Sequence, residues 1–343
     1  MNNQVHTFSL SIDFNLMNEI SRIDKFGGAW LVVEKREGRS LKQLKSIATV
    51  RSVGASTRIE GSKLNDNEVQ VLIDKMQPLK LEERDVQEVI GYFETLDLIS
   101  DSFNEIDITE NNIKHLHNVL LKHSVKDEWH KGNYKQHSNV VEATNADGTK
   151  YVVFKTTEPG FATDDAMRKL MDWYHSDSEV HPMIKCALFV YDFLSIHPFQ
   201  DGNGRLSRLL ATLLLLKNGY GWVEYVSFEH EIESRKTEYY KVLMQCQNER
   251  PGENVYPWLM FFLNCLNNIQ NQLTNKLNAE GTESQISPRD KMIYVFIESH
   301  TGCQSGEIAG KLNMALPTIK KILAEMVQKE IIVKEGIGRG TYY

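Results

Sequence analysis

The sequence is poor in the features that mark secreted, membrane-spanning and fibrous proteins. It has only 8 prolines and 4 cysteines among 343 residues, and its start, MNNQVHTFSLSIDF, lacks the basic segment and apolar run of a secretion signal. The most apolar window, LLATLLLL at 209–216, is much shorter than the ~20 residues that cross a bilayer. We therefore expect an ordinary globular protein without a membrane span, and a buried helix at 209–216.

An excess of positive charge is also missing. The formal net charge is -7 and the sequence pI is near 5.9, which excludes a chain that coats nucleic acid or an anionic membrane along its whole length. A local basic face remains open.

The cysteines form no CxxC pair and lie far apart in apolar or helical contexts, which favours buried, reduced thiols over disulfides or a zinc site. This usage suits a cytoplasmic protein. The four residues are Cys186, Cys246, Cys265 and Cys303.

Helical periodicity dominates the sequence, so the predicted fold class is mainly α. The exception lies between 136 and 161, where the β-rich runs SNVVEA and YVVFKT flank TNADGTK. Asp147 and Gly148 are strong turn residues, so this segment predicts one β-hairpin.

The last part of the chain has the pattern of a separate unit. Residues 271–287 turn polar and predict a linker, and Pro288 is the expected first residue of the next helix. The order that follows is helix, helix, helix and a two-stranded wing, which is typical of a winged helix-turn-helix. The predicted elements are helices at 289–299, 304–312 and 317–330, and strands at 331–335 and 341–343 around GIGRG.

The stretch HPFQDGNGRLSR at 197–208 concentrates chemistry in twelve residues. A Gly-Asn-Gly turn that opens a helix directs backbone N–H groups and the positive end of the helix dipole outward, so Gly202, Asn203 and Gly204 predict an anion site. Arg205 and Arg208 lie three residues apart on nearly one helix face, where both can reach phosphates.

Two further side chains of the stretch complete a reaction centre. Asp201 is a hard oxygen ligand at the position of a magnesium ion that bridges two phosphates. His197 follows an apolar helix that Pro198 ends, and its imidazole can take a proton from an attacking hydroxyl. His181, in a similar His-Pro pair, has none of these neighbours and is interpreted as structural.

This stretch resembles the Fic motif HPFx(D/E)GNGRxxR at every defined position, and the resemblance extends over about 107–250. Fic proteins are usually adenylyltransferases, which move AMP from ATP to a protein hydroxyl. The resemblance implies that His197 is the general base and Asp201 the magnesium ligand. Gly202, Asn203 and Gly204 would form the anion cradle, and Arg205 and Arg208 would hold the triphosphate, with Arg208 on the γ-phosphate.

The family resemblance also assigns roles outside the motif. Fic proteins carry a β-hairpin flap that registers a target segment by strand addition, here at about 138–155. Many relatives have Gly-x-(Phe/Tyr)-Arg before the flap, whereas this chain has GNYK with Lys135 in the arginine position. The segment RKTEYYKVL resembles the paired tyrosines near the nucleotide, which places Tyr239 or Tyr240 against the base or ribose; at least one of them is expected in the core.

Near the N-terminus, VGASTRIEGSKL by itself reads as a helix that ends at Gly61. Beside a Fic core, Ser56, Glu60 and Gly61 resemble the inhibitory pattern (S/T)xxxE(G/N). The resemblance implies an ion pair between Glu60 and Arg208, which would compete with the γ-phosphate of ATP for the guanidinium.

The resulting prediction is an autoinhibited, magnesium-dependent protein adenylyltransferase. Its expected parts are an N-terminal helical region with the inhibitory helix (1–100), a Fic core (101–270), the linker and a winged helix unit (288–343). Expected partners are ATP, a protein with a Ser, Thr or Tyr hydroxyl, which includes the chain itself, and a second copy in a homodimer. Three alternatives stay open: removal of AMP from modified protein, transfer from another nucleotide donor, and a DNA-binding regulator that senses nucleotide.

DNA contact would use the C-terminal unit. Its charges are nearly balanced, so contact with protein is as plausible as contact with DNA. The basic residues available for phosphates are Lys320, Lys321, Lys329 and Arg339.

Overall fold

The protein is mainly helical, as its sequence predicts, and its chain divides into two compact units, residues 1–270 and residues 271–343. A computed structural model describes residues 10, 12–34, 38–74, 83–144, 150–176, 179–283, 288–300, 302–312, 314–328, 331–336 and 341–343. None of the helices in these ranges combines the length and hydropathy that a bilayer crossing requires.

The first unit contains most of the helices and a pair of strands. In chain order its elements are α1 (Phe14–Glu34), α2 (Gly38–Ile59), α3 (Asp66–Asp74), α4 (Arg84–Ser102), α5 (Glu110–Leu120), β1 (Val140–Thr144), β2 (Lys150–Lys155), α6 (Phe161–Ser176), α7 (Pro182–Ile196), α8 (Asn203–Lys217), the 3-10 helix η1 (Gly221–Tyr225), α9 (Phe228–Ser234), α10 (Lys236–Gln247) and α11 (Tyr256–Glu283).

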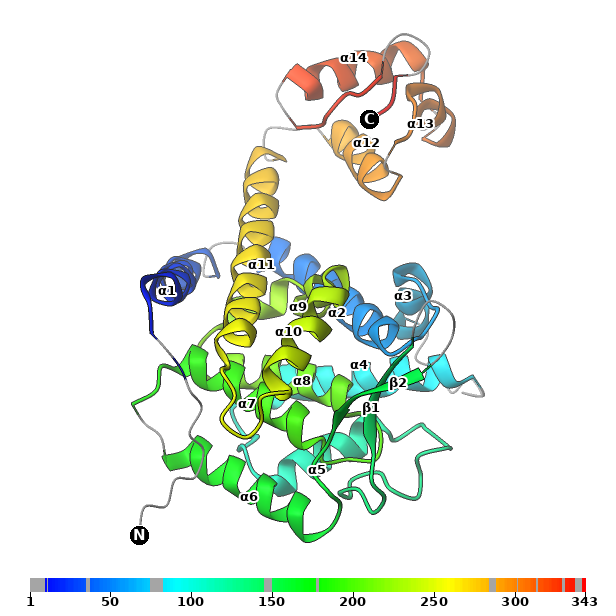
Figure 1. Cartoon of the computed structure of the whole chain (residues 1–343). Coiled ribbons are helices and arrows are strands. Elements are labelled where there is room, and N and C mark those ends of the chain that lie inside the picture. Colours follow the sequence, from blue (N-terminus) through cyan, green and yellow to red (C-terminus); the bar gives the residue numbers. More distant parts are fainter. Residues whose placement is uncertain are drawn as a thin grey trace. The chain divides into compact units, whose positions relative to one another are not determined.

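The core of the first unit surrounds α7 and α8, which pack against each other (Figure 1). The leucine run 209–216 is buried on every face of α8, as predicted, because α2, α4, α5 and α7 all contact this helix. A helix that is apolar all round is stable only in such a position. The short chain between α7 and α8 is therefore fixed at both ends by the core.

The structural roles predicted for His181 and the cysteines are confirmed. The Nδ1 atom of His181 accepts a hydrogen bond from the backbone N–H of Met183 at 3.3 Å and so caps α7. All four cysteines are buried and unpaired.

The end of α2 is shaped by Gly61, whose φ is 109°. The backbone N–H of Gly61 donates to the carbonyl of Arg58, and that of Ser62 donates to the carbonyl of Thr57, both at 3.1 Å. This is a Schellman ending, which needs a glycine because other residues rarely adopt positive φ. It makes Glu60 the last residue before the turn.

The strands β1 and β2 pair antiparallel with a bulge between Val141 and Glu142. β2 contacts α10. Asp147 and Gly148, the predicted turn, lie outside the described residues. The described strands fall within the predicted flap, 138–155.

The second unit contains α12 (Pro288–Ser299), α13 (Ser305–Lys311) and α14 (Leu316–Gln328). Its core consists mainly of isoleucine and leucine side chains from all three helices. The described part of the expected wing holds a single antiparallel bridge, Glu335 to Tyr342, rather than two full strands. Lys320 and Lys321 are exposed on α14, while Lys329 and Arg339 lie outside the described residues.

The predicted linker 271–287 is not coil over most of its length, because α11 continues to Glu283. Gln, Asn, Leu, Lys and Ala residues are compatible with a helix, and the segment contains no proline before Pro288. The loss of large apolar residues is therefore not a loss of helicity. Residues 284–287 lie outside the described part.

Candidate active site

The segment 197–208 is a tight connection between the two core helices. His197 ends α7 in the left-handed conformation (φ 54°, ψ 59°), and its N–H donates to the carbonyl of Phe193 at 2.9 Å. Gly202, with φ 80°, opens α8. Asn203 closes the loop, because its side chain accepts from the N–H of Phe199 at 2.9 Å and donates to the carbonyl of the same residue at 2.8 Å.

The imidazole of His197 has a defined tautomer. Its Nδ1 lies 3.3 Å from the carbonyl oxygen of Leu194, which can only accept, so Nδ1 carries the proton and Nε2 is left bare. Burial lowers the pKa of His197 to about 4, the Leu194 contact raises it, and the nearby charge of Lys135 lowers it further. At neutral pH the ring is thus an uncharged proton acceptor.

The N-terminus of α8 is an anion-binding end. Gly202 has no side chain that could cap the helix, so the N–H groups of the first turn point outward with the positive end of the helix dipole. The predicted cradle of Gly202, Asn203 and Gly204 is therefore a backbone feature. The side chain of Asn203 is used within the loop itself.

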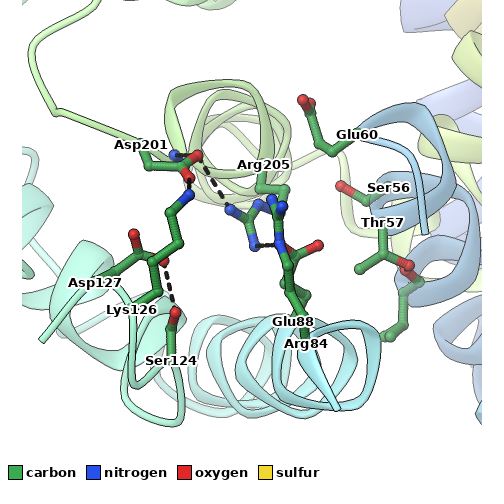
Figure 2. A network of polar contacts seen from close by, with 12 residues as sticks. Ser56, Thr57, Glu60, Arg84, Glu88, Ser124, Lys126, Asp127, Asp201 and Arg205 are labelled. Carbon is green, nitrogen blue, oxygen red and sulfur yellow. Dashed lines mark hydrogen bonds and ion pairs between the residues drawn. The ribbon is translucent and has the colours of Figure 1, made fainter.

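Arg205 and Asp201 face each other beside this helix end (Figure 2). The Nη2 atom of Arg205 is 3.4 Å from Oδ1 of Asp201, and Nη1 is 3.6 Å from Oε1 of Glu88 on α4. Arg205 is only 2% exposed, yet its Nε and Nη1 atoms have no hydrogen-bond partner among the described residues. Buried donors without partners are costly, so this guanidinium is suited to receive an anionic ligand.

The carboxylate of Asp201 has one oxygen available to a metal. Oδ1 accepts the N–H of Gly202 at 2.6 Å, whereas Oδ2 has only the ammonium of Lys126 at 3.5 Å, on a side chain that is 68% exposed (Figure 2). Burial alone would raise the pKa of Asp201, but the charge of Arg205 lowers it, so the group is an anion. No set of three or more His, Cys, Asp or Glu side chains gathers in the described chain to hold a metal. A metal ion at Asp201 would therefore need phosphate oxygens as its other ligands.

The ion pair between Glu60 and Arg208 is present in the structure. Nη2 of Arg208 donates to Oε1 of Glu60 at 2.8 Å and to the carbonyl of Ser56 at 3.0 Å, and Nε donates to the Ser56 hydroxyl at 2.8 Å. Arg208 is 2% exposed, whereas the Glu60 side chain is 31% exposed. Burial alone would raise the pKa of Glu60, but the charge of Arg208 lowers it below its usual value.

Glu60 also covers the start of α8. A Cβ atom on Gly204 would lie 2.4 Å from Oε1 of Glu60, which is closer than any real contact. The carboxylate therefore sits directly against the backbone of the first turn, and a side chain at position 204 would have to displace it. One carboxylate thus occupies both the guanidinium of Arg208 and the anion-binding end of the helix.

The two tyrosines of the YY pair have different environments. Tyr239 is buried, packs on Trp258 and Phe261, and has its hydroxyl near Ser207 and Arg208. Tyr240 is only half-buried and meets the ring of Tyr239 edge-on. Tyr239 is the core residue of the pair, and Tyr240 is the one accessible to a ligand.

His117 on α5 is a site residue that the sequence did not reveal. Its Nδ1 accepts from the N–H of Gly132 at 2.9 Å and its Nε2 lies 3.0 Å from the carbonyl of Asp201, while its ring stacks on Phe199 at 3.8 Å. The neutral ring therefore ties the motif loop to the loop after α5. Burial lowers its pKa to about 4. A histidine in an amphipathic helix gives no sequence signal for such a bridge.

Lys135, in the position of the family arginine, is buried below the hairpin. Its Nζ donates to Asn139 Oδ1 at 3.0 Å, to Thr156 Oγ1 at 2.8 Å and to the carbonyl of Ile196 at 3.2 Å. Burial lowers its pKa to about 8. Lys135 thereby joins both ends of the hairpin to the residue before His197.

Comparison with known proteins agrees with this geometry. Residues 107–215 match the model of the Fic/DOC family. The chain is 28% identical over 185 residues to "Protein adenylyltransferase Fic" of Drosophila sechellia, which covers 53% of this chain and 35% of that protein. It is 48% identical over 56 residues to the protein of the same name from Drosophila willistoni, which covers 16% of this chain and 11% of that protein.

Solved structures share the fold over most of the chain. A Fic family protein from Desulfovibrio desulfuricans G20 superimposes with a TM-score of 0.64 at 24% identity, over 96% of this chain and 94% of that one. A Fic domain containing signaling protein from Bacteroides thetaiotaomicron gives 0.59 at 24% identity, over 73% and 94%.

The fold and the site define a helical protein in which an uncharged, buried histidine lies beside the uncapped N-terminus of a helix. With the matches above, residues 107–215 are identified as a domain of the Fic/DOC family. The chain spans only about a third or less of the length of the curated relatives cited.

Proposed function

We propose that this protein transfers AMP from ATP to the hydroxyl of a protein side chain, a Ser, Thr or Tyr, and releases pyrophosphate. The observation that carries the proposal is the neutral Nε2 of His197 beside the uncapped N-terminus of α8. The printed names of the Drosophila relatives, "Protein adenylyltransferase Fic", support the same reaction. Among the partners predicted from the sequence, DNA and a second copy stay predictions.

The chemistry follows from the position of the base. The target hydroxyl oxygen attacks the α-phosphorus of ATP, the bond from that phosphorus to the oxygen bridging to the β-phosphate breaks, and pyrophosphate leaves. The hydroxyl proton passes to Nε2 of His197. Because Nδ1 is already committed to the carbonyl of Leu194, the proton has one destination on the ring.

The triphosphate would be held by backbone and arginines together. The first turn of α8 and the two buried guanidiniums, Arg205 and Arg208, supply positive charge in a site with little water, where electrostatic stabilisation is strongest. The residues present fit a magnesium ion, because Oδ2 of Asp201 is an anionic oxygen with only an exposed lysine to displace. Bound there, magnesium would neutralise charge on the phosphates. Tyr240 is placed to meet the base or ribose.

The same geometry supports autoinhibition by Glu60. A carboxylate and a γ-phosphate cannot both use the outer edge of the Arg208 guanidinium, and Glu60 also covers the backbone of Gly204. ATP bound beside Glu60 would be displaced from the productive pose. The partial exposure of Glu60 means that it can leave without unfolding the core.

Incubation with Mg²⁺ and ATP labelled at either the α- or the γ-phosphate tests the proposal. Glu60→Gly protein should carry the α label, on itself or on an added target, and no γ label. The same protein with His197→Ala in addition should carry neither. Transfer of the γ label would show a kinase and would reject AMP transfer.

A further inference from the structure

The guanidinium of Arg208 also contacts a chain of buried hydroxyls. Nε of Arg208 donates to the Ser56 hydroxyl at 2.8 Å, and the hydroxyl of Tyr92 on α4 lies near the same serine. Tyr92 donates to Oε1 of Glu229 on α9 at 2.9 Å. The contacts therefore run in the order Arg208, Ser56, Tyr92, Glu229.

Every member of this relay is out of solvent. Ser56 and Tyr92 are fully buried, and Arg208 and Glu229 are each 2% exposed. Burial raises the pKa of Tyr92 well above its usual value and the charge of Glu229 raises it further, so the phenol keeps its proton and remains a donor. The Tyr92 hydroxyl therefore remains the donor in its bond to Glu229.

Glu229 has no ion pair with a lysine or arginine within the described residues. Its second oxygen is 3.4 Å from the hydroxyl of Ser227, which also caps α9. A buried carboxylate is costly unless compensated, and the relay connects it through two hydroxyls to the cation of Arg208. The relay thus links a fixed anion to the inner edge of the guanidinium.

The outer edge of the guanidinium faces the anion site. Nη1 of Arg208 is 3.4 Å from the place of a Cβ on Gly204, at the first turn of α8. Ser56 is bonded by Nε and, through its carbonyl, by Nη2, which is also the nitrogen that bonds Glu60. An arginine that is held along one edge loses little freedom when the other edge binds a planar or tetrahedral anion.

We propose that Tyr92 and Glu229 are positioning residues, which through Ser56 orient Arg208 so that its outer edge meets the γ-phosphate of ATP. This inference rests on the proposed function, since it assumes that the anion site receives a nucleoside triphosphate. It assigns a role to two residues that contact neither the motif loop nor Glu60.

The test measures nucleotide binding without turnover. The parent protein carries Glu60→Gly, to vacate Arg208, and His197→Ala, to prevent transfer; ATP and ADP affinities are measured by calorimetry with Mg²⁺. Adding Tyr92→Phe should weaken ATP binding about fivefold, the worth of one hydrogen bond, and leave ADP binding unchanged, because ADP lacks the γ-phosphate. Glu229→Gln, which keeps the shape but removes the charge, should have a smaller effect in the same direction.

Tyr191→Phe is the matched control. Tyr191 is also a buried tyrosine whose hydroxyl meets a serine, Ser195, and donates to a glutamate, Glu253, at 3.3 Å, but on α7. Its loss should lower stability in the same way and leave the ratio of ATP to ADP affinity unchanged. The relay would be overturned if the ratio of ATP to ADP affinity were the same in the Tyr92→Phe protein as in the parent. It would also be overturned if Tyr191→Phe changed this ratio as much as Tyr92→Phe does. Failure of the parent to bind either nucleotide would instead reject the proposed function, and the relay with it.

Discussion

The motif loop at 197–208 and the end of α2 meet in the active site but are held in different ways. In the loop, Asn203 bonds both backbone groups of Phe199, Nδ1 of His197 is committed to Leu194, and the surroundings are buried. Glu60 is held by one ion pair just before a glycine turn and is 31% exposed. The motif loop is therefore fixed by the fold, whereas the carboxylate of Glu60 is held by fewer contacts and can be displaced.

The largest expected effect comes from breaking the chemistry of the loop. In Glu60→Gly protein, His197→Ala should lower the rate of AMP transfer by about 100- to 10,000-fold, the usual contribution of a general base. ATP affinity should change little, because the phosphates are held by other groups. Rates from labelled ATP and affinities from calorimetry check this prediction. A His197→Ala protein that kept a tenth of the activity would show that His197 is not the general base.

Substitutions of Glu60 test whether its carboxylate restrains the reaction. Glu60→Gly should raise AMP transfer by about 10- to 100-fold, since a charge-assisted hydrogen bond is worth about 1.5–3 kcal/mol. Glu60→Gln keeps the size of the side chain but loses its charge, so its rate should lie between the two. Equal initial rates in all three proteins would mean that Glu60 does not restrain the reaction.

The rigidity of the loop is tested by Asn203→Ala. The buried N–H of Phe199 would lose its partner, whereas its carbonyl would keep the amide of Asn139 at 2.9 Å, and the free energy of unfolding should fall by about 1–3 kcal/mol. Urea denaturation measures this loss. Asn133→Ala, at an exposed asparagine, is the control and should have no measurable effect; an equally stable Asn203→Ala protein would show that the loop does not depend on this closure.

The buried histidines make the loop sensitive to acid. The pKa values of His197 and His117 fall from 6.5 to about 4, so an unfolded chain binds their protons first as the pH drops. Stability is complete above pH 6.5 and is lost as the pH falls toward 4, at about 1 kcal/mol per pH unit for each histidine. Urea midpoints at several pH values should fall less steeply for His197→Ala than for the unsubstituted protein. Parallel slopes would contradict the assignment.

The smallest expected effect is at the turn that presents Glu60. Gly61→Ala places a side chain at φ 109° and should cost about 1 kcal/mol of stability while raising AMP transfer slightly, because Glu60 loses its fixed position. Gly219→Ala imposes a similar cost after α8 (φ 85°), away from Glu60. Gly219→Ala should lower stability as much as Gly61→Ala without raising the rate of AMP transfer. A higher rate in both variants would mean that the loss of stability, and not the position of Glu60, causes the rise.

The sequence allowed much of this site to be predicted because its chemistry is local. The helical class follows from the apolar periodicity, and the loop of His197 follows from a contiguous motif. The pairing of Glu60 with Arg208 is implied by the resemblance of a short second pattern to the inhibitory pattern of Fic proteins. His117, Tyr92, Glu229 and Glu88 could not be found in this way. Each reaches the site only through the packing of α4 and α5 on α8 and of α9 on α2, and the sequence contains no spacing rule that relates them.

The extent of α11 and of the wing was also beyond the sequence. The polarity of 271–287 does not show where the helix ends, and α11 continues to Glu283. The Glu335 to Tyr342 bridge is the described part of a wing for which two strands were expected. In α11 and in the described part of the wing, the polarity of the residues does not determine the secondary structure.

A crystal structure of Glu60→Gly protein with Mg²⁺ and a non-hydrolysable ATP analogue tests the account most directly. We predict the γ-phosphate on the outer edge of Arg208, the phosphates over the first turn of α8, and the α-phosphorus facing Nε2 of His197. Phosphates bound elsewhere, or an imidazole turned away from the α-phosphorus, would contradict it.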